Sequence, residues 1–137
     1  MKTNTVHFYV QRNSRFSTQD AVIPFELVRL NEGGAFDLPS GTFTAPSPGI
    51  YHLDFSALKD TTAIFLQIYL QVNGVSVGVA DTNQGSTGSY DAVSLSASLR
   101  LAKGDRVNLY NNGNNVLYDD SRHFTHFSGW LVEEELM

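Results

Sequence analysis

The densest group of chemically useful side chains in this sequence lies between positions 118 and 123. Its members are Tyr118, Asp119, Asp120, Ser121, Arg122 and His123. Carboxylates hydrogen-bond the hydroxyl groups of a sugar, an aromatic ring stacks on its apolar face, and a guanidinium pairs with an acidic group. Because binding residues gather on loops held by rigid scaffolds, the segment is predicted to bind a ligand of carbohydrate type. The alternative is a solvated polar loop that binds nothing.

Catalytic motifs are missing from the same chain. There is no Gly-x-Ser-x-Gly, no glycine-rich phosphate loop ahead of a helix and no His-Glu-x2-His. His123 and His126 lie three positions apart, but no third metal ligand follows at a recognisable spacing. Cysteine is absent, which excludes a disulfide, a thiolate metal site and a cysteine nucleophile. We therefore expect a binding protein and not an enzyme.

Length and charge narrow the range of partners. The chain has 137 residues and a formal net charge of −5, and its lysines and arginines are scattered singly. Neither nucleic acid nor an anionic lipid surface is therefore an expected partner. No apolar stretch approaches the roughly 20 residues that span a bilayer, so membrane insertion is not expected. No apolar run of a signal peptide follows Met1, which fits either an intracellular protein or a secreted domain without its leader.

The elements that must position the polar segment are strands. Apolar and polar residues alternate along 51–57, 66–72 and 93–101. A period of two places one face of each segment in a core, as in half-buried antiparallel strands. No stretch repeats the i, i+3, i+4, i+7 pattern of an amphipathic helix. The pattern predicts an all-β chain.

Turn residues fall where these strands should end. Asn73-Gly74 predicts a type I′ hairpin, because both positions of that turn need a positive φ. Gly104-Asp105 predicts a tight corner, and polar tracts at 85–89 and 111–115 predict loops. With eight to ten short strands and no linker or repeat, residues 1–137 are predicted to form one sandwich or jelly-roll domain.

Two stretches are apolar on both faces. One runs from Ala63 to Leu70 and the other from Phe124 to Val132. Since one face of a strand packs inside the domain, the other must be covered by a loop or by another subunit. Exposed apolar patches of several hundred Å² are uncommon on monomers, which favours an oligomer.

A spaced motif occupies eight positions in the first half of the chain. They are Phe25, Asn31, Phe36, Phe43, Gly49, Tyr51, Leu53 and Phe55. The motif resembles the signature of the C1q globular-head family, within the C1q/tumour necrosis factor superfamily, at every position but one. The exception is Leu53, where the family usually has phenylalanine. The Asn73-Gly74 turn and the segments 101–109 and 127–131 resemble later landmarks of the family, so that the resemblance covers nearly the whole chain.

The resemblance implies a fold, an assembly and a metal. The fold is a ten-stranded antiparallel jelly roll, and the assembly is a secreted homotrimer that recognises ligands through apical loops. The collagen repeat of many members is absent, as in stalkless, lectin-like invertebrate members. Several members carry Ca²⁺, and the resemblance points to Asp91, counted back from Gly104-Asp105, and to Asp81 as its ligands. The alternative is that both acids only begin and end a solvated loop.

Three functions follow from this resemblance. The leading one is lectin-like pattern recognition of glycans or microbial surfaces in innate immunity, in which three weak sites on one homotrimer gain avidity. The second is a signalling head of cytokine or adipokine type, whose ligand is a cell-surface receptor protein. The third is a structural trimerisation domain.

Overall fold

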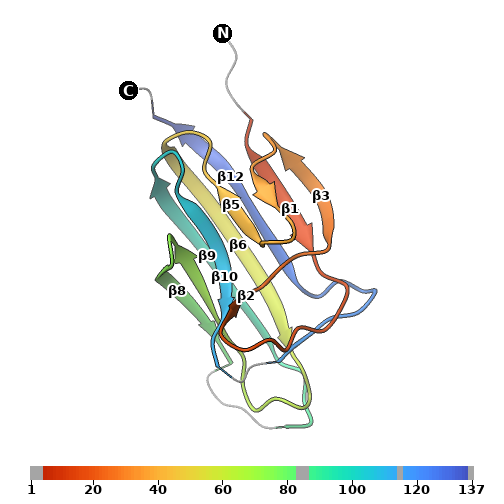
Figure 1. Cartoon of the computed structure of the whole chain (residues 1–137). Helices are drawn as coiled ribbons and strands as arrows, with labels where there is room; N and C mark the ends of the chain where they lie inside the picture. The colour runs from red at the N-terminus through yellow and green to blue at the C-terminus, as the bar shows by residue number, and fades with distance from the viewer. Residues whose placement is uncertain (1–4, 83–86, 114–115, 136–137) are drawn as a thin grey trace.

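Two β-sheets packed face to face make up the part of the protein that the computed structural model describes, residues 5–82, 87–113 and 116–135 (Figure 1). Every regular element in these ranges is a strand. The prediction of an all-β antiparallel jelly roll is therefore confirmed. Within the same ranges, no helix is long and apolar enough to cross a membrane.

Sheet A contains the longest strands. Its members are β1 (His7–Gln11), β3 (Leu27–Glu32), β6 (Gly49–Lys59), β9 (Ala92–Leu101), β11 (Leu117–Tyr118) and β12 (His126–Glu134). The strands run antiparallel in the order β3-β1-β12-β6-β9. β11 pairs with the last two residues of β6, beyond the end of β12.

Sheet B covers the inner face of sheet A. Its members are β2 (Ala21–Val22), β4 (Phe36–Asp37), β5 (Thr42–Thr44), β7 (Gln67–Val72), β8 (Val75–Asp81) and β10 (Arg106–Asn111). The order is β4-β5-β10-β7-β8, and β2 pairs with the far end of β10. The described residues thus hold twelve strands, not ten. The prediction missed pieces such as β2, β4 and β11, which are two residues long and too short to show an alternating pattern.

The aromatic residues of the spaced motif form the core between the sheets. Phe8 of β1 lies at the centre, with its ring centroid 4.7 Å from that of Phe36, 4.9 Å from Phe43 and 5.0 Å from Phe127. Phe25, Phe36, Phe43, Tyr51, Leu53 and Phe55 are all buried. Large rings and branched chains at alternate positions supply most of the apolar area that the two sheets bury.

The two remaining motif positions, Asn31 and Gly49, determine the local course of the backbone. The Asn31 side chain donates to the Phe36 carbonyl at 3.1 Å and accepts from the Phe36 N–H at 3.3 Å, so it closes the turn that leads into β4. Gly49 begins β6, where a Cβ atom would lie 2.3 Å from the carbonyl oxygen of Glu133. Only glycine allows β6 and β12 to approach each other this closely.

The β7–β8 hairpin confirms the turn prediction. Asn73 has a φ of 52° and Gly74 a φ of 81°, as a type I′ turn requires. Asn73 also reaches the neighbouring β9–β10 turn, where its Nδ2 donates to Asp105 Oδ1 at 3.0 Å. Asp105 accepts a second bond from the Ala102 N–H, and these two hydrogen bonds lower its pKa. The two turns are therefore tied together at one end of sheet B.

The two ends of the sandwich differ. At the start of β6, Gly49 pairs with Leu101 and Glu134, and both ends of the described chain lie there (Figure 1). At the finish of β6, Lys59 pairs with Leu117. We call this second region the loop end, and it consists of residues 60–66, 87–91 and 118–124.

Candidate functional site

The polar segment at 118–123 connects β11 to β12 at the loop end. Within it, Asp119 is buried, and its carboxylate accepts three backbone N–H groups. Oδ1 accepts from Asp120 at 2.8 Å and from Phe124 at 2.7 Å, and Oδ2 accepts from Thr125 at 2.8 Å. Of the six predicted ligand-binding residues, Asp119 therefore holds the backbone of its own loop in place and does not face solvent.

Asp120, Arg122 and Tyr118 form a hydrogen-bonded group at the surface. Arg122 Nη2 and Tyr118 Oη each donate to Asp120 Oδ2 at 2.7 Å, and Arg122 Nε donates to Oδ1 at 3.1 Å. The bonds from Arg122, and then that from Tyr118, hold the pKa of Asp120 well below its ordinary value. The carboxylate in turn raises the pKa values of Arg122 and Tyr118. An acidic ligand must therefore compete with Asp120 for Arg122.

Two further aromatic rings, those of Tyr90 and Phe124, flank this group. The Tyr90 ring centroid lies 4.9 Å from that of Tyr118, which lies 6.2 Å from that of Phe124. The Arg122 guanidinium carbon lies 4.8 Å from the centroid of the Phe124 ring. Tyr90 is 52% exposed. We call Tyr90, Tyr118, Phe124, Asp120 and Arg122 the aromatic patch, and it offers both stacking faces and hydrogen-bonding groups.

Ser121 and His123 complete the predicted set. Ser121 is exposed. His123 has a φ of 58°, and its Nδ1 lies 2.9 Å from the Arg12 carbonyl oxygen, so its ring is directed toward the backbone. His126 instead contacts Tyr9 on the outer face of sheet A. Across the described ranges, no three His, Asp or Glu side chains gather as a metal site within one chain would require.

The two acids singled out for Ca²⁺ lie at the borders of the β8–β9 connection. Asp81 ends β8 and accepts a hydrogen bond from Gln67 Nε2 at 2.9 Å. Asp91 precedes β9, and its Oδ2 accepts from Ser89 Oγ at 3.3 Å. Residues 83–86, between the two acids, lie outside the described residues. A calcium site shared among chains stays a prediction.

Lys59 supports the loop end from inside. Its side chain is fully buried, and Nζ donates to the carbonyl oxygens of Asp60 at 3.1 Å, Ala63 at 2.8 Å and Ser89 at 2.8 Å. A buried ammonium is costly unless hydrogen bonds replace its water. The three carbonyls do so, and they join residues 60–66 to residues 87–91 through one cation.

The outer face of sheet A is rich in aromatic and histidine side chains. The Trp130 ring lies between two imidazoles, with centroids 4.6 Å from His52 and 5.5 Å from His7. Nearby, Tyr9 stacks on His126 at 5.4 Å. These side chains come from three strands, because β1, β12 and β6 are neighbours in the sheet. Within one chain, nothing described covers it.

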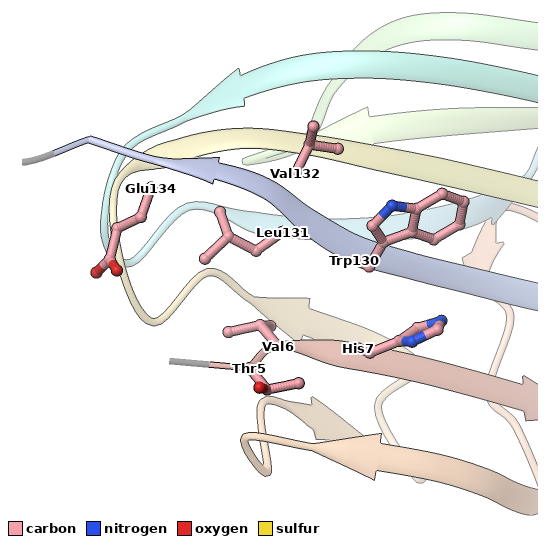
Figure 2. A pocket seen from close by; sticks show the side chains of 7 residues that line it. All are labelled: Thr5, Val6, His7, Trp130, Leu131, Val132 and Glu134. Carbon is pink, nitrogen blue, oxygen red and sulfur yellow. The ribbon is translucent and has the colours of Figure 1, made fainter. Parts of the chain in front are cut away.

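A groove of about 420 Å³ lies at the edge of this face, between β1 and β12 (Figure 2). Its lining residues are Thr5, Val6, His7, Trp130, Leu131, Val132 and Glu134. The C-terminal stretch predicted to be apolar on both faces is so, since Phe127 is buried whereas Trp130 is 36% and Val132 57% exposed. The exposed half of this stretch is the apolar surface that a subunit could cover.

Sequence reasoning missed Tyr90 and Phe124. Tyr90 lies 28 positions before Tyr118, and the two rings meet because the end of β6 pairs with β9 on one side and with β11 on the other. Phe124 was assigned to an apolar strand stretch, although it lies in the loop before β12. An aromatic residue directly after the turn-forming Gly88-Ser89 was the one sequence signal that could have drawn attention to Tyr90.

The family model for the C1q domain matches residues 7–132. The chain belongs to the C1q domain family, which confirms the resemblance drawn from the spaced motif. Complement C1q tumor necrosis factor-related protein 3 of Mus musculus is 36% identical over 129 residues, which cover 94% of this chain and 52% of the relative. Caprin-2 of Danio rerio is 33% identical over 132 residues, covering 95% of this chain and 14% of Caprin-2. The chain thus spans about half the length of the first of these relatives.

Solved structures show the same fold at lower identity. The globular domain of zebrafish complement 1qA aligns with a TM-score of 0.79 and 23% identity, covering 95% of this chain and 99% of that one. Murine APRIL aligns with a TM-score of 0.73 and 14% identity, covering 93% and 99%.

Proposed function

We propose that this protein is a secreted, homotrimeric recognition module that binds glycans through the aromatic patch. The observation that carries the proposal is the patch itself. It combines an exposed Tyr90 ring, a second ring on Tyr118, and a carboxylate and guanidinium at its edge. Rings that stack on sugar faces beside groups that bind hydroxyls are the usual composition of a carbohydrate site.

A glycan array tests this proposal. The wild-type protein should bind a defined group of glycans, and Tyr90→Ala and Tyr118→Ala should each weaken that binding several-fold, because each removes a stacking surface. Lys103→Ala, at an exposed position outside the patch, should leave the binding unchanged. Unchanged binding in both tyrosine variants, or no glycan bound at all, would contradict the proposal.

The outer face of sheet A supports the homotrimer. Trp130 and Val132 are exposed there, and the Trp130 ring lies against the rings of His7 and His52. Contiguous apolar and aromatic surface of this kind is usually buried in an assembly. Threefold association through this face would cover these side chains and leave the outer face of sheet B in solvent.

Analytical ultracentrifugation tests the assembly. The wild type should sediment at three times the 15.1 kDa of one chain. Trp130→Asp places a charge in the proposed interface and should give single chains, whereas Thr44→Asp, on the outer face of sheet B, should stay trimeric. A wild-type protein that sediments as a single chain at micromolar concentration would overturn the homotrimer.

A calcium ion held between chains by Asp91, with Asp81 as a second ligand, is part of the proposal. Carboxylates, carbonyls and water are the ligands that Ca²⁺ prefers, and it takes about six to eight of them. Asp91→Ala should lower the melting temperature in Ca²⁺ but not in chelator. If the difference between Ca²⁺ and chelator is the same in Asp91→Ala as in the wild type, the metal site is excluded.

A receptor-binding signalling head is the second candidate function. Its support is the 36% identity to a protein named as a tumor necrosis factor-related protein. Here the ligand is a cell-surface protein, and the wild-type trimer should capture one from membrane extracts. Trp130→Asp, as a single chain, should lose that capture, while Tyr90→Ala should keep it.

Capture that depends on the glycans of the membrane protein and on Tyr90 would favour the lectin-like function instead. If the protein binds no glycan and captures no membrane protein, trimerisation itself remains as the function.

A further inference from the structure

A second polar site lies on the outer face of sheet B, away from the loop end. It is a groove of about 460 Å³, within the range of small-molecule sites. Its lining residues are Asp37, Ser40, Thr42, Thr44, Asn73, Gly74, Arg106 and Asn108. All but the glycine carry a hydroxyl, an amide or a charge, and none is aromatic or aliphatic. Such a lining fits a ligand covered with polar groups.

The groove is built from paired strands. Its floor consists of β5 and β10, where Thr44 is the register partner of Arg106 and Thr42 Oγ1 accepts from Asn108 Nδ2 at 3.3 Å. One wall is the β4–β5 turn, in which Asp37 Oδ2 accepts from the Ser40 N–H at 3.1 Å. The other wall is the β7–β8 hairpin. Because two strands and two turns fix these groups, the groove is in place before any ligand arrives.

Hydrogen bonds to β10 hold the β7–β8 hairpin that forms the second wall, and the space beside Gly74 is open. Asn73 Oδ1 accepts from the Arg106 N–H at 2.9 Å, and the Asn73 N–H donates to the Arg106 carbonyl at 2.8 Å. At Gly74, a Cβ atom would meet nothing within 4 Å. The wall is therefore a rigid turn beside an unfilled volume.

Arg106 differs from the other described arginines in its side-chain partners. Each of the others has one: Arg12, Arg15, Arg100 and Arg122 pair with an acidic side chain, and Arg29 donates to Gln11. The Arg106 guanidinium is exposed and forms no hydrogen bond or ion pair with any residue that the structure describes. An unpaired guanidinium in a formed groove can take a carboxylate by two parallel hydrogen bonds.

Asn108 offers a further unused group. Its Nδ2 donates to Thr42, but its Oδ1 is buried and has no hydrogen-bond partner among the described residues. A buried acceptor without a donor is destabilising. A small rotation of the amide toward the groove would let a ligand hydroxyl donate to it.

We propose that this groove binds a sugar residue that carries a carboxylate, of the uronic or sialic acid class. Arg106 takes the carboxylate, and Thr42, Thr44, Asn108 and Asp37 bind the hydroxyls. The lack of an aromatic lining argues against a neutral sugar held mainly by stacking. The site is independent of the aromatic patch and remains accessible when sheet A is covered by other subunits. A homotrimer would carry three such grooves.

An NMR titration of the full chain tests the proposal. D-glucuronate, N-acetylneuraminate and, as a neutral counterpart, D-glucose are added to ¹⁵N-labelled wild-type protein. Saturable shifts should appear at the amides of Thr42, Thr44, Arg106 and Asn108 with one or both acids and not with glucose. Arg106→Gln should weaken the binding of the acid about tenfold or more, since it removes a charged hydrogen-bond pair.

Three further variants separate this site from the patch. Thr44→Glu places a carboxylate opposite Arg106 and should weaken acid binding as Arg106→Gln does. Lys103→Gln, at an exposed position outside the groove and the patch, should leave it unchanged, and Arg122→Gln reports any acid that binds at the patch instead. Equal shifts with glucose, or acid binding unaffected by Arg106→Gln and Thr44→Glu, would overturn the groove. Shifts that map instead to residues 118–124 and vanish in Arg122→Gln would overturn it as well, while supporting glycan binding by the aromatic patch.

Discussion

The loop end and the groove on sheet B hold similar side chains in opposite states. At the loop end, Asp119 accepts three backbone N–H groups, Lys59 donates to three carbonyls, and Asp120 and Arg122 pair with each other. In the groove, the Arg106 guanidinium has no partner among the described residues. A group that is already paired stabilises its own loop and must exchange that partner to bind a ligand. An unpaired group is available at once.

Side chains that hold the backbone in place therefore differ from side chains that are available to bind a ligand. At the loop end the charges fix the backbone, and the rings of the aromatic patch, with Tyr90 exposed and Tyr118 and Phe124 half-buried, are left to contact a ligand. In the groove, pairing of β10 with β5 and β7 fixes the backbone, so the Arg106 guanidinium is not needed to hold it. The predictions below test the difference through stability, since removal of a paired group should be destabilising and removal of a free one should not.

The largest effect is expected for Lys59→Met. Methionine fills much of the same volume but leaves three buried carbonyl oxygens without their donor. We expect the free energy of unfolding to fall by about 3–5 kcal/mol in urea denaturation. Lys103→Met, at an exposed position, should change it by less than about 0.5 kcal/mol. Equal stability of both variants would show that the buried ammonium does not hold the loop end together.

A smaller loss is expected for Asp119→Asn. The amide keeps one acceptor but places an NH₂ group against a backbone donor, so that a hydrogen bond becomes a repulsive contact. The expected loss is roughly 2–3 kcal/mol by thermal denaturation. Asp120→Asn is the matched comparison, because its ion pair with Arg122 lies at the surface, where water screens it, so this variant should lose less stability than Asp119→Asn. A larger loss in Asp120→Asn than in Asp119→Asn would reverse the assigned roles.

Acid should weaken the loop end through Asp60. Burial acts to raise the pKa of Asp60, but the hydrogen bonds from Thr62 and Arg15 outweigh it, so the folded-state pKa lies below the ordinary value. The stabilisation is complete above the unfolded pKa of about 3.9 and disappears as the pH falls through the lower folded-state value. Asp60→Asn should therefore melt below wild type at pH 7, and the gap should narrow below about pH 4. A gap that widens in acid would contradict the assigned direction, and the exposed Glu32→Gln serves as the control.

The smallest effect is expected for Arg106→Gln. Because the guanidinium contacts no described partner, its loss should change the free energy of unfolding by less than about 0.5 kcal/mol. Urea denaturation checks this directly. A loss of 2 kcal/mol or more, on the scale expected for Asp119→Asn, would place Arg106 among the paired groups and remove the contrast with the loop end.

Much of the fold was predictable because its signals are local. Alternation located β6, β7 and β9, the Asn73-Gly74 pair located a hairpin, and the spaced aromatics located the core. Lys59 carried a signal too, since it continues the inward positions 51, 53, 55 and 57 of β6. An extension of the period by one step would have predicted a buried lysine.

The candidate sites were less predictable because their residues meet only through long-range pairing. Tyr118 and Arg122 could be picked out by type, but their pairing with Asp120 could not. The groove depends on β10 lying beside β5, which places Arg106 next to Thr44 from 62 positions away. No pattern within either segment encodes that register. Burial of Asp119 depends likewise on backbone donors whose directions the sequence does not reveal.

The placement of the chain's ends decides how this molecule can be presented on a solid support. Both ends of the described chain lie near the start of β6, and the loop end lies near its finish. The strand has 11 residues, so the two regions are separated by roughly 33 Å. A biotin or a fused scaffold attached at either end would point the loop end outward, away from the sensor surface. Such a protein could be displayed in one orientation without redesign.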